Sequence, residues 1–565
     1  MARRIFLAFG ILCEHIIISV FIAFFNYRSI MDVITSDQVV EILINAGVPI
    51  RRILAAVDRG SVNQGANRDS QRHIFKNALA RALNIDTPYG SMRKRYTIQG
   101  SEGPLTFDGL CPFAVLSETT RLCPAFGSLI IQRLRGPTAK IAFYNDEITP
   151  GNVHRPEKAR CYQALYWTIN QLPDRMRTRG NMPGWFVFSY IQSQKLIDAG
   201  VSLSVLTASI LKIWWCSDIL APNLSRTGVR ISTLNDNLQR ITAEFACVMA
   251  DEKALKETFS VKGASGTKAC LKCSNVIGRA AHVVDGLVHW SNPDFSAIVP
   301  HTIESFAEMA RRLQVEVDAG RPIELLEQIF GLNFEAGAIP FDEEAASLAR
   351  APLSAYFDWM HSLCASGGVA QFELNQLVRK LIEHGVALKD LDEFTHSITF
   401  PKNNQVALPK KFWQKRIVRK AGKHIRAFAS EVLTAVSILG AFLDSVIKPL
   451  GLAPDHVRCF DSLRTMVGIL QTGSEAIHQL PLLEQTMEDH HKMFEVLYPD
   501  CVKPKLHYLR HTAECYKSFN VALNCFSAER KHKQSKRIAA FSLSDVCSSM
   551  LAYAARDMLM DFRQG

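Results

Sequence analysis

The sequence predicts an α/β protein in which a strand-rich core precedes a long helical segment. Short apolar runs with aromatic and β-branched residues lie between positions 138 and 251, and their length suits single buried strands. Between about 300 and 500, apolar residues recur instead at the i, i+3 and i+4 spacing typical of one helix face. The chain of 565 residues is long enough for two to four domains.

Composition and charge are those of an ordinary globular protein. Hydrophobic residues make up 48% of the chain and charged residues 21%, which allows a sizeable core. The formal net charge of +11 permits a nucleic-acid partner without requiring one. The 14 cysteines are scattered and only Cys270 and Cys273 form a close pair, so a secreted disulfide-bonded protein is not expected.

The N-terminal segment is strongly apolar. Residues 5–25 follow two arginines and are almost wholly apolar, a pattern typical of a signal anchor or a single membrane helix. Glu14 and His15 lie in its middle, where a charge is costly in a bilayer. Two alternatives stay open, namely a buried helix and upstream sequence that precedes a true start near Met31.

The elements of the core follow in a definite order. Helical spacing predicts helices over 31–85, with a polar loop over 59–74. Four apolar runs are then expected to be strands, with a helix over 196–215 before the last of them: 138–146, 161–170, 184–192 and 240–251. The first and the last of these runs end in an acid, Asp146 and Asp251.

These two acids are candidate ligands of catalytic metal ions. Cleavage of phosphodiesters by two divalent ions needs about three converging carboxylates, because Mg²⁺ and Mn²⁺ prefer oxygen ligands. On adjacent strands the tips of Asp146 and Asp251 would lie side by side, although a lone acid after a strand is more often a turn or helix cap. Glu147 and Glu252 follow them directly, and we prefer the first acid of each pair because it closes the apolar run.

A second candidate site combines cysteine and histidine. Cys270 and Cys273 form a CxxC pair, which alone could be a coincidence, a redox pair or half of a zinc site. His507 and His511 lie four residues apart, so both imidazoles would project from one face of a helix. Together the four residues could hold zinc, and the alternative is two buried thiols and two unrelated helical histidines.

Two basic stretches, 409–426 and 529–537, could contact phosphates. The candidate cations are Lys410, Lys411, Lys415, Arg416 and Arg419 in the first stretch and Arg530, Lys531 and Lys533 in the second. Phe412 and Trp413 would be available to stack on bases. A solvated helix face explains the same pattern, as does a nuclear-import signal for the first stretch.

The order of these motifs resembles that of a known family. Two aspartates, a CxxC pair, a long helical segment, an HxxxH pair and Glu529 follow one another in this chain. This order is similar to that of DDE transposases of the CACTA type and of the recombination-activating recombinases of vertebrates. The strings that carry the resemblance are NDEITPGN, KGASGTKACLKC, FDWMH, KPKLHYLRH and FSAERKHK, and it covers roughly residues 138–540.

The resemblance implies a ribonuclease-H-like mixed sheet, interrupted by a large α-helical insertion, with a zinc knot. It implies Asp146, Asp251 and Glu529 as the catalytic ligands of two Mg²⁺ or Mn²⁺ ions, with Asp358, beside His361 in FDWMH, as the rival of Glu529. It implies Zn²⁺ as a structural ion on Cys270, Cys273, His507 and His511. The expected parts are an apolar segment (1–30), a mostly α-helical N-terminal region (31–135), the first part of the core (136–273), the insertion (274–500) and the HxxxH pair with the final core helix (501–565).

The function expected from this resemblance is that of a DNA transposase or nuclease, which cuts and joins phosphodiesters by a two-metal mechanism. Its partner would be DNA, its location the nucleus, and the active form a homo-oligomer. The alternative is a catalytically inactive, transposon-derived DNA-binding or scaffold protein, because the first 130 residues contain no recognisable domain for binding transposon ends. A membrane-anchored protein is a third interpretation, which depends on residues 5–25 alone.

Overall fold

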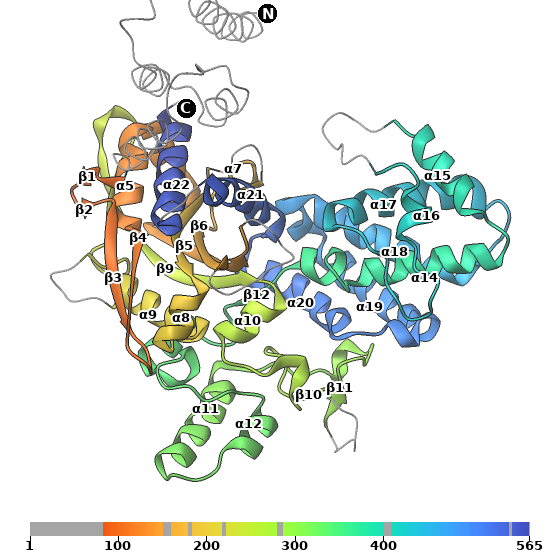
Figure 1. Cartoon of the computed structure of the whole chain (residues 1–565), viewed down its shortest axis with the longest axis horizontal. Helices are drawn as coiled ribbons and strands as arrows, with labels where there is room; N and C mark the ends of the chain where they lie inside the picture. The colour runs from red at the N-terminus through yellow and green to blue at the C-terminus, as the bar shows by residue number, and fades with distance from the viewer. Residues whose placement is uncertain are drawn as a thin grey trace, which may run out of the picture.

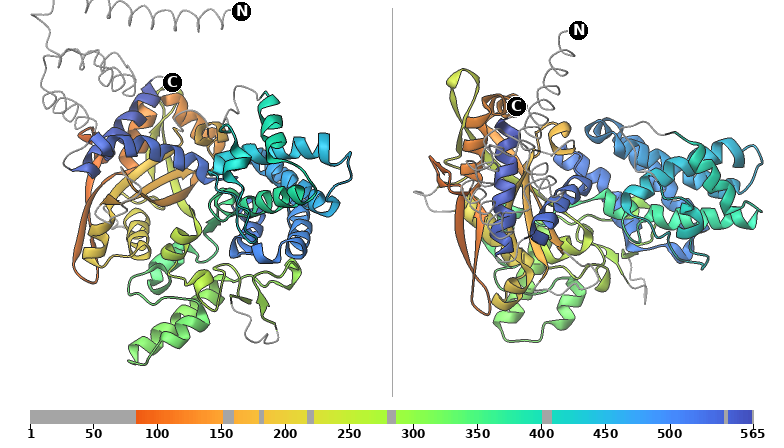
Figure 2. Two further views of the ribbon diagram at one scale, coloured as in Figure 1. Left: turned by 45° about the vertical axis from the view of Figure 1, so that its right-hand side comes forward. Right: turned by 45° about the horizontal axis from the view of Figure 1, so that its top comes forward.

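The computed structural model describes residues 83–150, 160–178, 183–216, 222–278, 286–399, 408–541 and 545–563. The apolar segment 5–25 and nearly all of the helices predicted over 31–85 lie outside these residues. The described chain is a mixed α/β structure in which a curled sheet, covered by helices, lies beside a body made of helices alone (Figures 1 and 2).

The curled sheet is mixed in strand direction. Seven of its strands follow one another in the order β12 (Ala355–Phe357), β9 (Leu238–Ala250), β5 (Thr138–Ile148), β6 (Tyr162–Ile169), β7 (Trp185–Gln192), β4 (Pro104–Leu110) and β3 (Arg93–Gln99). The strands β12, β9 and β5 are parallel, whereas every pair from β5 to β3 is antiparallel. An eighth strand, β8 (Val229–Ser232), pairs with the first residues of β9. The four strands predicted from apolar runs are confirmed as β5, β6, β7 and β9.

Side chains along β5 alternate between the two faces of the sheet, as the period of two in a strand requires. The ring of Phe143 meets Trp214 of α9 (Leu203–Trp215) edge-on, with centroids 5.1 Å apart. The ring of the next residue, Tyr144, lies on the other face, 5.8 Å from His532 of α21 (Cys525–Phe541). Helix α9 therefore covers one face of β5, and α21 covers the other.

The helix predicted over 196–215 is two helices. α8 (Ser193–Ala199) ends at Gly200, which adopts the left-handed conformation with φ of 62° that glycine accepts without steric cost. Helix α9 then begins after Ser202, whose side chain accepts a hydrogen bond from the backbone N–H of Val205. These local signals interrupt an apolar pattern that is continuous in the sequence.

Residues 83–135, the described part of the N-terminal region, are not mostly helical, which differs from the prediction for this part. Residues 83–135 contain helices α5 (Pro112–Leu122) and α6 (Pro124–Arg133), but also β1 (Asp86–Thr87), β2 (Gly90–Ser91), β3 and β4. β3 pairs with β4 along its whole length, and β4 joins the main sheet where Gly109 lies opposite Ser189 of β7. The alternation of RKRYTIQ, in which Tyr96 and Ile98 are less exposed than their neighbours, is the signal in the sequence for this strand.

The helical character predicted between 300 and 500 is confirmed, with one exception. α11 (Ile303–Asp318) and α12 (Glu324–Phe330) lie below the sheet in Figure 1, and α13 (Glu343–Ala349) follows them and packs against α9. The separate helical body contains α14 (Val369–Glu383), α15 (Leu388–Ser397), α16 (Phe412–Arg416), α17 (Ala429–Phe442), α18 (Pro454–Gln471) and α19 (Leu480–Leu497). The exception is β12, which pairs with β9 and therefore belongs to the sheet although it falls within 274–500.

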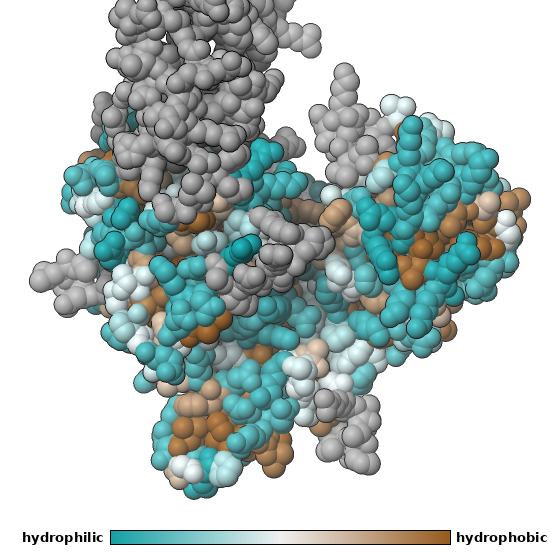
Figure 3. Space-filling model, viewed as in Figure 1, coloured by the Kyte–Doolittle hydropathy of each residue, from teal (hydrophilic) through white to brown (hydrophobic). Residues whose placement is uncertain are grey.

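Within the described residues, one helix, Ala429–Ile447, is long and apolar enough to cross a membrane by length and composition. In the most apolar 18-residue stretch of this helix, 56% is buried inside the protein. Burial of this kind is also typical of a core helix in a protein that does not cross a membrane. Among the brown areas of Figure 3, one lies over the helical body and another lies at the bottom, where Figure 1 places α11 and α12. The exposed apolar side chains of α11 and α12 are Val315, Leu325 and Ile329.

Candidate metal centres

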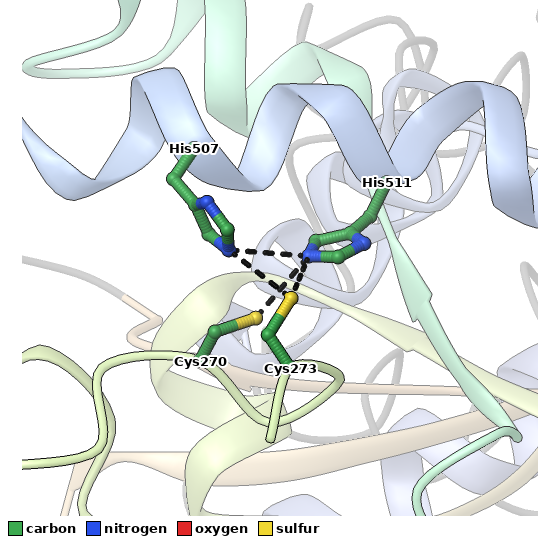
Figure 4. Close-up of side chains that lie close together, drawn as sticks. All are labelled: Cys270, Cys273, His507 and His511. Carbon is green, nitrogen blue, oxygen red and sulfur yellow. Dashed lines mark hydrogen bonds between the residues drawn. The ribbon is translucent and has the colours of Figure 1, made fainter. Parts of the chain in front are cut away.

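Cys270, Cys273, His507 and His511 come together as one buried group. Figure 4 shows the two histidines on a helix, α20 (Pro504–Phe519), directed at the two cysteines of the loop below it. Sγ of Cys270 lies 3.2 Å from Nε2 of His511, and Sγ of Cys273 lies 3.5 Å from Nε2 of His507. All four ligand atoms lie within 4.8 Å of one another, and all four residues are buried.

These distances suit a tetrahedral zinc ion. With Zn–S bonds of about 2.3 Å and Zn–N bonds of about 2.0–2.1 Å, the edges of such a tetrahedron measure about 3.3–3.8 Å. The two Nε2 atoms of His507 and His511 are 3.3 Å apart, and Sγ of Cys273 lies 3.4 Å from Nε2 of His511. The group could therefore bind a structural zinc, with ligands from two segments far apart in the sequence.

Neighbouring groups hold these side chains in place. Nδ1 of His511 lies 2.7 Å from a carboxylate oxygen of Glu514, the usual outer partner of a metal-binding imidazole. Lys272, which is 2% exposed, pairs with the other oxygen of Glu514 at 3.1 Å. Burial would raise the pKa of Glu514, but His511 and Lys272 outweigh it and lower this pKa to about 2, so the carboxylate stays ionised. The hydroxyl of Tyr508 donates to the carbonyl of Ala269 and ties α20 to the cysteine loop.

Asp146 on β5 and Asp251, the residue directly after β9, lie at the same level beside each other at the ends of two adjacent parallel strands. The last ladder pair of β5 and β9 joins Tyr144 to Met249, and the two aspartates each follow two residues later. Asp251 is the N-cap of α10 (Glu252–Thr258), and its Oδ1 accepts a hydrogen bond of 2.7 Å from the backbone N–H of Ala254. Asp251 therefore has both features considered in the sequence analysis: it caps a helix, and it lies beside Asp146.

Glu529 approaches Asp146 from the helix that covers this face of the sheet. Glu529 and His532 lie one turn apart on α21, and Nδ1 of His532 is 3.3 Å from Oδ2 of Asp146 and 3.6 Å from Oε2 of Glu529. Ligand atoms of the three residues all lie within 4.8 Å of one another. The fold thus brings together the two predicted carboxylates that are furthest apart in the chain, with Asp251 close by.

The neighbouring side chains affect the pKa values of Asp146 and Glu529. Burial raises the pKa of Asp146, and the charges of Glu529 and Asp251 raise it further, while His532 opposes them. Burial also acts to raise the pKa of Glu529, but the nearby side chains of His532, His361 and Lys536 outweigh it and lower this pKa. Carboxylates of like charge thus share one site, where a bound cation would relieve their repulsion.

The second acid of each predicted pair faces elsewhere. Glu147, the next residue on β5, lies on the opposite face of the sheet, where its Oε1 accepts a hydrogen bond of 2.7 Å from Ser193. Burial raises the pKa of Glu252, which lies near Tyr508 on the zinc-knot side. The preference for Asp146 over Glu147 therefore agrees with the alternation of the strand.

Asp358, the rival of Glu529, lies just after β12 and is engaged by His361. Its Oδ2 accepts a hydrogen bond from the backbone N–H of His361 at 3.0 Å and pairs with the His361 ring at 2.8 Å. Burial acts to lower the pKa of His361, but the carboxylates of Asp358, Asp251 and Glu529 outweigh it and raise this pKa. His361 and His532 thus belong to the acidic cluster, although they were not predicted as site residues from the sequence. His532 could have been identified from its spacing, because it follows Glu529 by three residues and so lies on the same face of a helix.

The basic stretches are only partly free to meet DNA. In the first, Arg416 pairs with Glu431 at 3.3 Å, while four predicted cations are exposed: Lys410, Lys411, Lys415 and Arg419. Phe412 and Trp413 are wholly buried, and the indole N–H of Trp413 donates to Thr395, so the expected stacking on bases is wrong. These two rings anchor the short helix α16 to α15 instead.

In the second stretch, two of the three predicted cations are engaged by backbone carbonyls. Arg530 donates to the carbonyl of Thr178 at 2.8 Å, and Lys531 donates to the carbonyl of Trp185 at 2.6 Å. Burial lowers the pKa of Lys531, as expected for an ammonium group turned into the fold. Lys533 is exposed.

No family model matches this sequence, and no curated protein matches it either. The resemblance described above therefore stays a prediction, which depends on the motifs and on the geometry of the two centres.

Proposed function

We propose that this protein cuts and joins DNA as a transposase or nuclease of the ribonuclease-H-like type, with Asp146, Asp251 and Glu529 as its metal-binding carboxylates. The observation that carries the proposal is the convergence of Asp146 and Glu529, whose ligand atoms lie within 4.8 Å although they come from a strand and a helix remote in the chain. Carboxylate oxygens are the ligands that Mg²⁺ and Mn²⁺ prefer, so the residues fit these ions.

The strand order supports a ribonuclease-H-like core. β7, β6 and β5 are antiparallel neighbours, and β9 and β12 follow β5 in parallel. The helices from α14 to α19 lie between β12 and α21 in the chain, which agrees with a helical insertion ahead of the last core helix. Asp146 and Glu529 would then belong to the first strand and the last helix of this core.

Each carboxylate is held by a rigid element, which is what a metal site needs. Asp146 pairs with β6 within the ladder, Glu529 lies in the first half of α21, and Asp251 caps α10. Burial and the like charges of Glu529 and Asp251 raise the pKa of Asp146, so a bound cation would favour its ionised form. Two bound divalent ions would supply activation of the attacking oxygen and stabilisation of the leaving oxygen of the phosphodiester.

The zinc-type knot would support the same core. It joins the loop that follows α10 to α20, which leads directly into the segment before α21. A structural Zn²⁺ at this point would hold the two ends of the long helical insertion together. It would thereby fix the position at which α21 begins. DNA as partner, a nuclear location and a homo-oligomeric active form are parts of the same proposal.

One observation favours the alternative of an inactive DNA-binding or scaffold protein. Arg530 and Lys531 follow Glu529 directly, yet both donate to backbone carbonyls of the fold. The carboxylate site therefore has fewer free cations for phosphates than the sequence suggested, whereas the exposed lysines of 410–415 lie on the helical body. In this alternative the chain binds DNA through that body without cleaving it.

A nicking assay tests the proposal. The full-length protein, loaded with zinc, is incubated with supercoiled plasmid and Mn²⁺ beside three variants purified in the same way. We expect Asp146→Asn and Asp251→Asn to reduce nicking by at least about 100-fold, and the second keeps the helix cap because Asn caps as well as Asp. Glu147→Gln, on the opposite face of β5, is the control and should nick like the unsubstituted chain.

Equal nicking by the unsubstituted protein and by Asp146→Asn would refute the catalytic role of this site. No nicking by any form, combined with retained plasmid binding, would favour the inactive DNA-binding protein.

A further inference from the structure

His532 is a third potential ligand beside Asp146 and Glu529. Its ring is 1% exposed, and among the described residues neither ring nitrogen makes a hydrogen bond of acceptable geometry. A buried imidazole normally makes a hydrogen bond through at least one nitrogen, so this ring calls for an explanation. The nearest acceptors of Nδ1 are the carboxylates of Asp146, at 3.3 Å, and Glu529, at 3.6 Å.

Aromatic packing holds this ring in place. The imidazole is stacked near Tyr166, with centroids 5.5 Å apart, and lies 5.8 Å from the ring of Tyr144. Tyr166 is held by the hydroxyl of Tyr190, which in turn contacts Ser535 on the same helix as His532. The ring therefore cannot turn toward solvent to satisfy its nitrogens, and Nδ1 stays directed at the two carboxylates.

We propose that His532, Asp146 and Glu529 together form a binding site for one divalent transition metal, with two carboxylates and one imidazole as ligands. This inference rests on the proposed function for the location of the ion, and it adds the identity of the third ligand and the metal preferred. Ligand atoms of the three side chains lie within 4.8 Å of one another, and a cation between them satisfies the free nitrogen and both charges.

The ligand set determines which ion is preferred. Mg²⁺ favours oxygen ligands and keeps much of its water, whereas imidazole nitrogen suits the divalent transition metals, Mn²⁺ least among them. A site made only of Asp146, Asp251 and Glu529 would discriminate little between Mg²⁺ and Mn²⁺. With His532 as ligand, we expect this position to bind Mn²⁺ at least about tenfold more tightly than Mg²⁺.

Pulsed electron paramagnetic resonance of bound Mn²⁺ tests the ligand directly and without DNA cleavage. The zinc-loaded full chain is titrated with Mn²⁺ after growth with either ¹⁴N- or ¹⁵N-histidine. A directly bound imidazole couples its nitrogen to the electron spin, so the modulation pattern must change between the two isotopes. This comparison needs no substitution at His532 and so does not depend on a variant that folds.

Two variants then assign the histidine. We expect His532→Gln to lose the nitrogen coupling and His478→Gln to keep it, because His478 is an exposed side chain outside the acidic cluster. Coupling that survives in His532→Gln, or is absent from the unsubstituted protein, would overturn the inference. Zinc content and circular dichroism verify that both variants are folded.

Asp146→Asn separates this inference from the proposed function. If Mn²⁺ binding is lost in Asp146→Asn but the unsubstituted protein shows no histidine coupling, the carboxylate site stands and only the role of His532 is refuted. If Mn²⁺ binding is unchanged in Asp146→Asn, the ion lies elsewhere and both proposals fail. As a second measurement, His532→Asp should bring the Mn²⁺-to-Mg²⁺ affinity ratio close to one, and an unchanged ratio would also refute the inference.

Discussion

Oδ1 of Asp358 accepts a hydrogen bond of 3.0 Å from the backbone N–H of Cys525, the first residue of α21. Because the other oxygen of Asp358 is paired with His361, this buried carboxylate joins the edge of the sheet to the helix that carries Glu529 and His532. We therefore propose that Asp358 positions α21, because both of its carboxylate oxygens accept hydrogen bonds in this structure.

We expect Asp358→Ala to destabilise the protein by about 2–4 kcal/mol, since it leaves a buried N–H and an imidazole without their partner. Urea unfolding measures this loss, and Mn²⁺ titration measures the accompanying drop in affinity at the carboxylate site. Asp455→Ala, at an exposed ion pair with Arg458, is the control and should change stability by less than about 1 kcal/mol. Unchanged Mn²⁺ affinity in Asp358→Ala would contradict a positioning role.

Removal of the zinc-type knot should be visible in metal content and in stability. Cys273→Ser is expected to lower zinc from about one ion per chain to nearly none, because a tetrahedral structural site needs all four ligands. Elemental analysis and thermal unfolding check this, and treatment of the unsubstituted protein with a chelator should lower the melting temperature in the same way. Cys123→Ser changes a thiol outside the knot and should keep its zinc. Equal zinc in both variants would rule out the site.

Charge reversal on the helical body should weaken binding to DNA. The triple variant Lys411→Glu, Lys415→Glu and Arg419→Glu removes three exposed cations of the first basic stretch. We expect the affinity to fall by at least about tenfold at low salt, and the salt slope to become shallower by about one for each phosphate that is no longer neutralised. Fluorescence anisotropy with a duplex at several salt concentrations measures both. Reversal of Lys389, exposed on α15, serves as the control, and an equal effect there would indicate a general charge effect.

Stability should fall in mild acid partly because of His491. Burial holds the pKa of His491 at about 3, well below its ordinary value, while its Nε2 lies 2.5 Å from the carbonyl of Leu506. The folded protein therefore leaves this ring neutral at pH 5.5, whereas the unfolded chain binds a proton there. Its contribution is complete above about pH 6.5 and is lost as the pH falls, by about 1.4 kcal/mol between pH 7.5 and 5.5.

Urea unfolding of His491→Gln at these two pH values measures that contribution. The variant should lose about 1.4 kcal/mol less than the unsubstituted chain over this interval. His478→Gln, at an exposed position, should show the same pH dependence as the unsubstituted chain. Identical losses in His491→Gln and the unsubstituted protein would contradict a neutral buried ring.

Local sequence patterns predict many of the helices and strands correctly. They fail for elements that form only by pairing with a segment far away in the sequence. β5, β6, β7 and β9 are recognisable because each is an apolar run of strand length, and the helices of the helical body because their spacing is regular. The three-residue strand β12 has no such signal, since it is a strand only through its pairing with β9. The break at Gly200 is visible as a glycine but is hidden within a continuous apolar pattern.

The sequence likewise identifies candidate metal ligands by residue type and spacing, but it does not predict which side chains surround them. CxxC and HxxxH are spacings that a zinc ion can use, and acids at the ends of two strands are positions that divalent ions can use. The burial of Phe412 and Trp413 could not be predicted from the sequence, because the stretch around them is basic and burial depends on contacts with α15. The same holds for Lys531, whose partner is a carbonyl on β7.

The sequence by itself determined which side chains are available: the acids, the thiols and imidazoles, and the alternation that sends Asp146 and Glu147 to opposite faces of β5. Only the tertiary structure decided which of them meet, because the parallel pairing of β5 with β9 and the packing of α21 on β5 are contacts between remote segments. Such contacts depend on the shape and burial of whole surfaces, which no short stretch of sequence encodes.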